Sequence, residues 1–263
     1  QYGEIGMNFV LRRIVWPLVI SILPFIAMAR ADDAVRLTNG EWPPYFSEEM
    51  KNGGLGSQIV REAFELAGKT VEYGYYPWKR AYVLAETGHW DGSVLWGWSE
   101  ERQKAFYISD PVFEAREVFF YRRDGTFDWD KLDDLHDLRI AGNVGYFYGP
   151  DFHAAADAEV FKLDLATSAV TSIKKLLAGR VDAYIDDEIV GLHVLHSQFG
   201  SDQAAKITVH PKAVWVTPLY LLLSRKKESN AETIKAFNLG LRRLRQSGRY
   251  YQLLAQATNP NGS

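Results

Sequence analysis

One short pattern occurs twice in the sequence and restricts the possible fold more than any other feature. The first copy runs from Leu84 to Trp96 (LAETGHWDGSVLW) and the second from Leu177 to Asp186 (LAGRVDAYID). In each copy a helical segment stops at a glycine, an aspartate follows three residues later, and an apolar strand begins directly after it. Units of this kind build parallel α/β sheets. Because the copies lie about ninety residues apart, they predict two similar lobes rather than one continuous sheet.

The rest of the chain adds helices and strands of the same kind. Helical spacing of apolar residues predicts helices over 55–67 and 78–86, and β-rich runs predict strands that include 71–75, 118–121 and 138–142. A long apolar run at 213–224 contains Pro218, so we expect a sheet edge or a bend there.

The order of these elements predicts where the chain passes between the lobes. We expect lobe one to comprise residues 32–122 and 216–263, and lobe two to comprise residues 123–215. Two crossings close together form a hinge, with a cleft between the lobes. Ligands of parallel α/β sheets bind beyond the carboxyl ends of strands, which here are residues 96–102 and 186–188.

The N-terminal segment has the pattern of a secretory signal peptide. Arg12 and Arg13 precede a short apolar run, and Ala29 and Ala31 form an A-x-A sequence typical of a cleavage site. The run is shorter than the ~20 apolar residues of a spanning helix, so retention as a membrane anchor is the less favoured alternative. We therefore expect residues 1–31 to be a signal peptide with an N-terminal extension, cleaved near Ala31 during export to the periplasm.

Composition and missing motifs exclude several classes of function. Without the first 31 residues the chain has 27 basic and 32 acidic side chains, a net charge of −5, which argues against binding to nucleic acid or an anionic membrane surface. The absence of cysteine excludes disulfides, thiolate metal sites and cysteine nucleophiles. No H-x-x-x-H metal pair on a clear helix, no G-x-S-x-G elbow and no phosphate loop occurs. We expect a soluble monomer without metal or cofactor.

Six segments, in their order and spacing, resemble the extracytoplasmic solute-binding proteins of family 3, the amino-acid-binding type that serves ABC importers. The similarity covers the chain from Val35 to about Ala257. It implies an α/β, two-lobe periplasmic-binding-protein-like fold of type II, with two hinge crossings and a ligand cleft between the lobes. The segments are GEWPPY at 40–45, GHWD at 88–91, ER and FYISDP within 101–111, DLHDLRIAG at 134–142, GRVDA at 179–183 and SGRY at 247–250.

The resemblance also implies two ligand-binding residues of opposite charge. The family arginine before F-x-x-S-x-P binds the ligand carboxylate and matches Arg102, whose guanidinium fork suits both carboxylate oxygens. The family aspartate that holds the ligand ammonium matches Asp187, and Asp186 is its acidic neighbour. Two alternatives remain open. Arg102 is a solvated charge in the run 100–104, or Asp186 or Asp187 is the N-cap of a helix that begins near Ile189.

Aromatic residues stand where the family has small polar contact residues. Trp96 and Trp98 replace hydroxyl residues just before the arginine, and Tyr146 lies in a loop that is normally rich in Gly, Ser and Thr. Such rings offer stacking faces for a flat, aromatic or cationic ligand, whereas the alternative is that some of them are core residues. The further ligand contacts expected are Trp42, Arg80, Trp96, Trp98 and Tyr146.

The residues and the resemblance together favour a binding protein over an enzyme. We expect it to capture a small carboxylate-bearing ligand, an amino acid or a related molecule, for an ABC permease in the inner membrane. Two alternatives remain: a periplasmic enzyme of the same fold, such as a dehydratase or a cell-wall lyase, and a sensory module that docks on a receptor.

Overall fold

The computed structural model describes residues 2–3 and 34–258. The chain divides into two units, residues 1–32 and 33–263, and every helix and strand described below belongs to the second. The segment expected to be a signal peptide lies, apart from residues 2–3, outside the described residues. Within the described residues, no helix combines the length and apolar character needed to cross a membrane.

Lobe one, as we use the term, is built on a parallel core of three strands. β1 (Ala34–Asn39) pairs with both β2 (Thr70–Tyr75) and β3 (Gly92–Gly97). The short strand β4 (Phe106–Ile108) pairs with the end of β9. The helices are α1 (Leu55–Leu66), α2 (Trp78–Glu86), α3 (Glu100–Ala105), α8 (Asn230–Gln246) and α9 (Arg249–Thr258), with a 3-10 turn, η2, at Lys51–Gly53.

Lobe two repeats this arrangement. β6 (Arg139–Asn143) pairs in parallel with β7 (Lys162–Ala166) and β8 (Ala183–Asp187). Its helices are α4 (Pro150–Asp157), α5 (Ala169–Leu177), α6 (Glu188–Gln198) and α7 (Ser201–Ala204), with a 3-10 turn, η3, at Leu132–Leu135.

The duplicated sequence pattern has the same structural role in both lobes. α2 and α5 are each followed by a glycine of positive φ, Gly88 at 81° and Gly179 at 66°. The aspartate that follows then accepts a hydrogen bond from the neighbouring parallel strand: Asp91 from the Arg36 backbone N–H at 2.7 Å, and Asp182 from the Arg139 backbone N–H at 2.8 Å. Each copy therefore joins the strand it introduces to the strand beside it.

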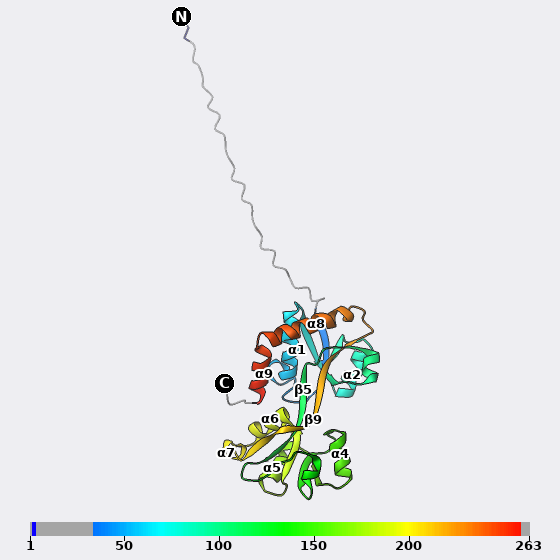
Figure 1. The fold of residues 1–263 in the computed structure, drawn as a ribbon. Helices are drawn as coiled ribbons and strands as arrows, with labels where there is room; N and C mark the ends of the chain where they lie inside the picture. Colours follow the sequence, from blue (N-terminus) through cyan, green and yellow to red (C-terminus); the bar gives the residue numbers. More distant parts are fainter. Residues whose placement is uncertain (1, 4–33, 259–263) are drawn as a thin grey trace. The chain divides into compact units, whose positions relative to one another are not determined.

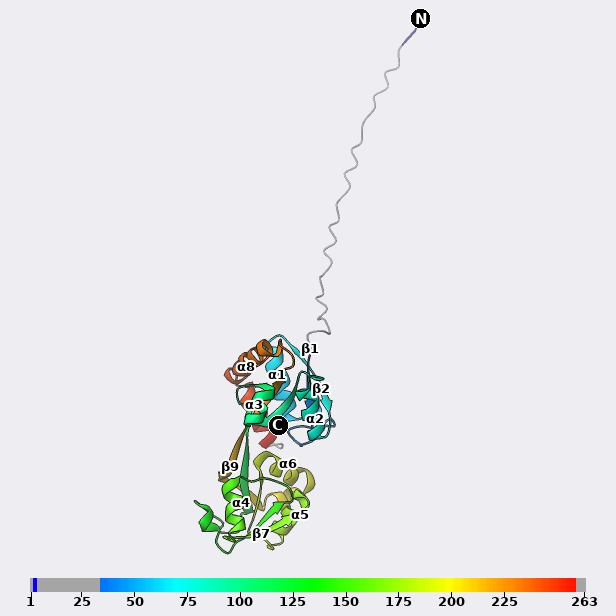
Figure 2. The same ribbon diagram turned by 90° about the vertical axis from the view of Figure 1, so that its right-hand side faces the viewer.

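Two long antiparallel strands connect the lobes, as Figures 1 and 2 both show. β5 (Phe113–Arg122) pairs with β9 (Ile207–Ser224) and with β8, so the hydrogen-bonded order is β2-β1-β3-β9-β5-β8-β6-β7. The expectation of two separate sheets is wrong. β5 and β9 are long enough to extend through both lobes, so the strands of the two lobes form one sheet. Leu219 is the last residue of β9 that pairs with β3, and the adjacent Pro218 pairs with β5 but not with β3. At the proline β9 is therefore a sheet edge on one side.

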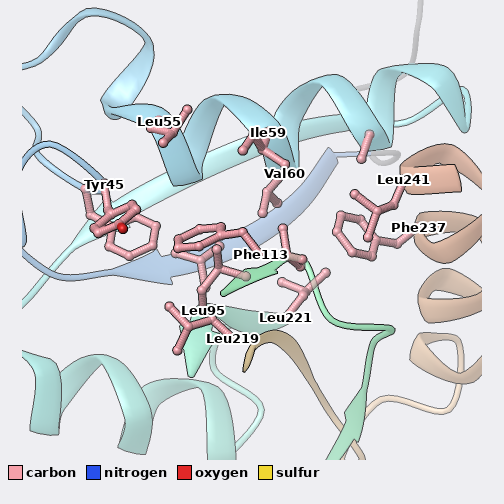
Figure 3. Close-up of a cluster of buried hydrophobic side chains, with 14 of the residues drawn as sticks. Tyr45, Leu55, Ile59, Val60, Leu95, Phe113, Leu219, Leu221, Phe237 and Leu241 are labelled. Atoms are coloured by element: carbon pink, nitrogen blue, oxygen red, sulfur yellow. The ribbon is translucent and has the colours of Figure 1, made fainter. Parts of the chain in front are cut away.

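Each lobe has its own apolar core. In lobe one the core lies between the sheet and the helices α1 and α8, with Phe64 and Phe237 in ring contact at 4.8 Å, and Figure 3 shows part of it. Lobe two packs separate clusters around Phe120 and Phe119. The first turn of α6 is an exception, because Ile189 and Val190 of lobe two are buried within the lobe-one core.

Candidate functional site

A row of aromatic rings lies at the carboxyl ends of the lobe-one strands. Ring centroids are 6.3 Å apart for Trp42 and Phe46, 5.9 Å for Phe46 and Trp78, and 5.2 Å for Trp78 and Trp96. The three tryptophans are half-buried, so each keeps part of its surface exposed. Gly40 permits this packing, since a Cβ atom there would lie 2.4 Å from the Trp78 ring. We call these four side chains the aromatic row.

Arg102 lies at the end of the aromatic row. Its guanidinium stands 5.1 Å from the centre of the Trp96 ring and donates from Nη1 to the Gly97 carbonyl at 2.6 Å. Ser99 caps α3 by accepting from the Arg102 backbone N–H at 3.2 Å. Within the described part of the chain no carboxylate pairs with Arg102, so all five of its N–H donors are without an acidic partner.

A pocket of about 350 Å³ adjoins this arginine, between α2 and the turn from β3 to α3. Trp78, Tyr82 and Trp96 supply its aromatic wall, and its polar lining comprises Ser99, Arg102, Lys79, Glu86 and Glu101. The pocket therefore offers ring faces beside an unpaired guanidinium, a combination that suits a ligand with a carboxylate and a flat or apolar part.

Two other predicted contacts of lobe one lie differently. Trp98 is 54% exposed, and Arg80 is exposed with its guanidinium 5.2 Å from the centre of the Tyr76 ring. On α2 position 80 is about 200° around the helix from positions 78 and 82, which form the pocket wall. The structure thus brings Trp42, Trp96 and Arg102 into one continuous group, but not Arg80.

In lobe two, Asp187 serves as the N-cap of α6. Its Oδ1 accepts from the backbone N–H groups of Ile189 and Val190, both at 3.0 Å, and from the Tyr45 hydroxyl at 2.9 Å, while Oδ2 accepts from the Arg116 backbone N–H at 3.2 Å. The N-cap alternative is therefore confirmed for this residue. Burial raises the pKa of Asp187 to about 6, although the donors around it favour its ionised form.

Asp186 is also fully occupied by partners inside lobe two. Its Oδ2 accepts from the Tyr184 hydroxyl and from Asn143 Nδ2, and its Oδ1 accepts from the Asp187 backbone N–H at 2.9 Å. Burial raises the pKa of Asp186 to about 7. This side chain has no exposed surface, so its hydrogen bonds stabilise the end of β8 inside the lobe.

A third carboxylate, Glu117, was not among the predicted residues. It lies on β5 directly opposite Asp187 of β8, and its Oε2 is buried without any hydrogen-bond partner in the described residues. Burial, and then the charges of Asp187 and Asp186, raise the pKa of Glu117 to about 9. A signal existed in the sequence, because Glu117 alternates in phase with the buried Phe113, Ala115 and Phe119.

Tyr146 belongs to the exposed loop that follows β6. Its side chain is 44% exposed, and its ring centroid lies 6.2 Å from that of Tyr148. Burial, followed by the charges of Asp186, Glu117 and Asp187, raises the pKa of Tyr146.

Tyr45 connects the two groups across the lobes. Its ring centroid is 4.7 Å from that of Trp42 in the aromatic row, and its hydroxyl donates to Asp187. No ion pair joins Arg102 to Asp187 in the described residues, so their joint contact with one ligand stays a prediction. A search of residues 2–3 and 34–258 finds no group of three or more His, Cys, Asp or Glu side chains that could hold a metal ion.

The two lobes joined by long strands define an α/β fold of the periplasmic-binding-protein type. The sequence model of one protein family, the bacterial extracellular solute-binding proteins, family 3, matches residues 35–259, and the chain belongs to this family. No match was found among curated proteins.

Solved structures share the fold at low sequence identity. Substrate-binding domain 2 of Lactococcus lactis GlnP, in an open conformation, has a TM-score of 0.70 at 19% identity, covering 86% of this chain and 95% of that chain. An ancestral cationic amino acid solute-binding protein has a TM-score of 0.67 at 20% identity, covering 86% and 96%. A histidine kinase sensor domain similar to periplasmic binding proteins has a TM-score of 0.58 at 21% identity, again covering 86% and 96%.

Proposed function

We propose that the protein captures a small ligand bearing a carboxylate and a large apolar or cationic part, and delivers it to an ABC permease after export to the periplasm. The observation that carries this proposal is the unpaired, half-buried guanidinium of Arg102 beside the rings of the pocket. In this role Arg102 binds the carboxylate, and Trp78 and Trp96 pack against the rest of the ligand. Membership of the extracellular solute-binding family, and the names of the substrate-binding domain of GlnP and of the ancestral amino-acid binder, support binding of a small solute.

The acidic residues of lobe two form the opposite pole of the proposed site. Asp187 and its neighbours would face the positive end of the same ligand when the lobes close, and Trp42, Trp98 and Tyr146 would supply further contacts. Arg80 would take part only from outside the pocket wall. Contacts from both lobes to one ligand favour the closed form, because either set alone binds more weakly.

Substitution of Arg102 tests the carboxylate-binding role. A panel of L-amino acids, their decarboxylated amines and aromatic carboxylates is screened with the wild-type protein by thermal shift, and each hit is measured by calorimetry. A charge-assisted hydrogen bond contributes about 1.5–3 kcal/mol, so Arg102→Ala should weaken binding of a carboxylate ligand by roughly 10- to 150-fold. Binding of the matching amine without the carboxylate should be unchanged.

Arg61→Ala is the matched control. Arg61 is also half-buried, stands 5.2 Å from the centre of the Tyr73 ring and donates to a backbone carbonyl, but it lies on α1 outside the pocket. Equal losses in both variants, or undiminished binding by Arg102→Ala, would remove Arg102 from the site. Turnover of a bound substrate would instead favour the enzyme alternative, for which a second structure of the ancestral binder, described as a precursor of cyclohexadienyl dehydratase, gives the related fold.

A further inference from the structure

We propose that Glu117 on the connecting strand β5 accepts a positively charged group at the side-chain end of the ligand, an ammonium or a guanidinium, and so determines the charge specificity of the site. The inference rests on the proposed function and names, among the acidic neighbours of Asp187, the residue on β5 that receives the positive group. It also assigns the positive end of the ligand to a different side chain from Asp187.

The first support is the hydrogen-bonding state of Glu117. Its side chain makes no hydrogen bond and no ion pair in the described residues, and its Oε2 is shielded from solvent. Buried polar atoms in folded proteins nearly always have a partner, so an unpartnered carboxylate oxygen requires an explanation. The side chain as a whole keeps some exposed surface, which leaves the carboxylate accessible from one direction.

The second support comes from the two neighbouring carboxylates, which have no comparable capacity left. Asp187 already accepts from three backbone N–H groups and the Tyr45 hydroxyl. Asp186 accepts from Tyr184, from Asn143 and from a backbone N–H, and it has no exposed surface. Among the three, only Glu117 can gain a new donor without losing an old one.

The third support is that the described protein supplies no cation here. The neighbouring Arg116 directs its guanidinium elsewhere, donating to the Pro211 carbonyl at 2.9 Å and standing 3.7 Å from Glu188. The titratable groups that interact with Glu117 are all acids, namely Asp186 and Asp187 on β8 and the tyrosines Tyr45, Tyr146 and Tyr148. A ligand cation would therefore be the first positive charge at this position.

The exposed Tyr146 ring makes the same position favourable for a cation. A cation gains from contact with an aromatic face as well as from a carboxylate, and the charge of Glu117 is among those that raise the pKa of Tyr146. When the cation binds, the carboxyl group of Glu117 loses its proton to the solvent, and the resulting carboxylate pairs with the ligand. Binding then releases up to one proton for each ligand molecule.

Two nearly isosteric ligand pairs test the charge specificity. L-arginine and L-citrulline differ in the charge of the side-chain end, as do L-lysine and L-norleucine, and all four carry the same α-carboxylate and α-ammonium, so only the side-chain cation is compared. Calorimetry at pH 7 should show at least one cationic member binding the wild-type protein at least tenfold more tightly than its neutral partner. The buffer takes up the released proton, so the heats measured in phosphate and in Tris should differ by the number of protons released times the difference between the ionisation enthalpies of the two buffers.

Glu117→Gln is the decisive variant, with Glu114→Gln, an exposed site on the same strand, as the matched control. Glu117→Gln should lose the preference for the cation and the proton release while it still binds the neutral partner, and Glu114→Gln should behave as wild type. Retention of the preference in Glu117→Gln overturns this inference but leaves the proposed function intact. Tighter binding of the neutral members by the wild type also overturns this inference and leaves the proposed function intact. No binding across the whole carboxylate panel overturns both the inference and the proposed function.

Discussion

Replacement of Glu117 by glutamine should stabilise the ligand-free protein, and the gain should grow with pH. The folded state raises the pKa of Glu117 from its ordinary value of 4.5 to about 9, because the group is buried beside Asp187 and Asp186. Between these two values the folded protein keeps a proton that the unfolded chain has lost. The free energy of unfolding of the wild type therefore falls as pH rises through this window, by about 1.4 kcal/mol per pH unit.

Glutamine has the shape of the protonated carboxyl group but cannot ionise, so the variant lacks this loss. Its advantage should be near zero at pH 4.5 and about 3 kcal/mol at pH 7, from 2.5 pH units at 1.36 kcal/mol each. Asp186 and Asp187 are present in both proteins, so their own titrations largely cancel in the difference.

Urea unfolding of both ligand-free proteins at pH 5, 6, 7 and 8 measures this difference directly. Glu114→Gln on the same strand should show no comparable slope. A difference between Glu117→Gln and wild type that stays constant with pH, or a variant that is less stable at pH 8, would refute the view that the folded protein holds Glu117 in its neutral form.

Two other substitutions each test a single contact of the structure. Tyr45→Phe removes the hydroxyl that donates to Asp187 and should lower the free energy of unfolding by about 1.5–3 kcal/mol at pH 8, where Asp187 is ionised, as measured by urea denaturation. A loss below about 0.5 kcal/mol would show that the contact across the lobes adds little. Gly40→Ala places a Cβ atom 2.4 Å from the Trp78 ring and should cost about 1–3 kcal/mol and change the tryptophan fluorescence; an unchanged spectrum would contradict the packing of the aromatic row.

Local patterns in the sequence predict most of the fold. The helix expected at 78–86 matches α2 over its whole length, and the strand expected at 71–75 lies within β2. The duplicated pattern succeeds because its parts interact locally: the helix ends at a glycine of positive φ, and the aspartate reaches the adjacent strand. What periodicity could not show is that β5 and β9 join the two sheets, because strand pairing over such sequence distances depends on tertiary contacts.

The candidate site was predicted less completely, for reasons that differ between residues. Trp42 and Arg102 were expected from the resemblance to the family, and Trp96 from its place just before the arginine; the structure places all three in one group, while their contact with a ligand stays a prediction. Arg80 shows the limit of that approach, since a residue on the correct helix can still lie on another face. Glu117 was missed because one carboxylate in an apolar strand has no motif, and only its in-phase position among buried residues marks it.

The position of Glu117 links the charge of the ligand to the contact between the lobes. Glu117 lies opposite Asp187, and when ionised it repels the Asp187 carboxylate. Asp187 in turn accepts a hydrogen bond from the Tyr45 hydroxyl of the other lobe. In the free protein a proton on Glu117 prevents this repulsion, and in the complex the ligand cation takes the place of that proton. Rising pH therefore weakens the free protein while it favours capture of a cation. A binding protein retains such a carboxylate at the junction of its lobes because its complex, rather than its free form, contains the missing positive charge.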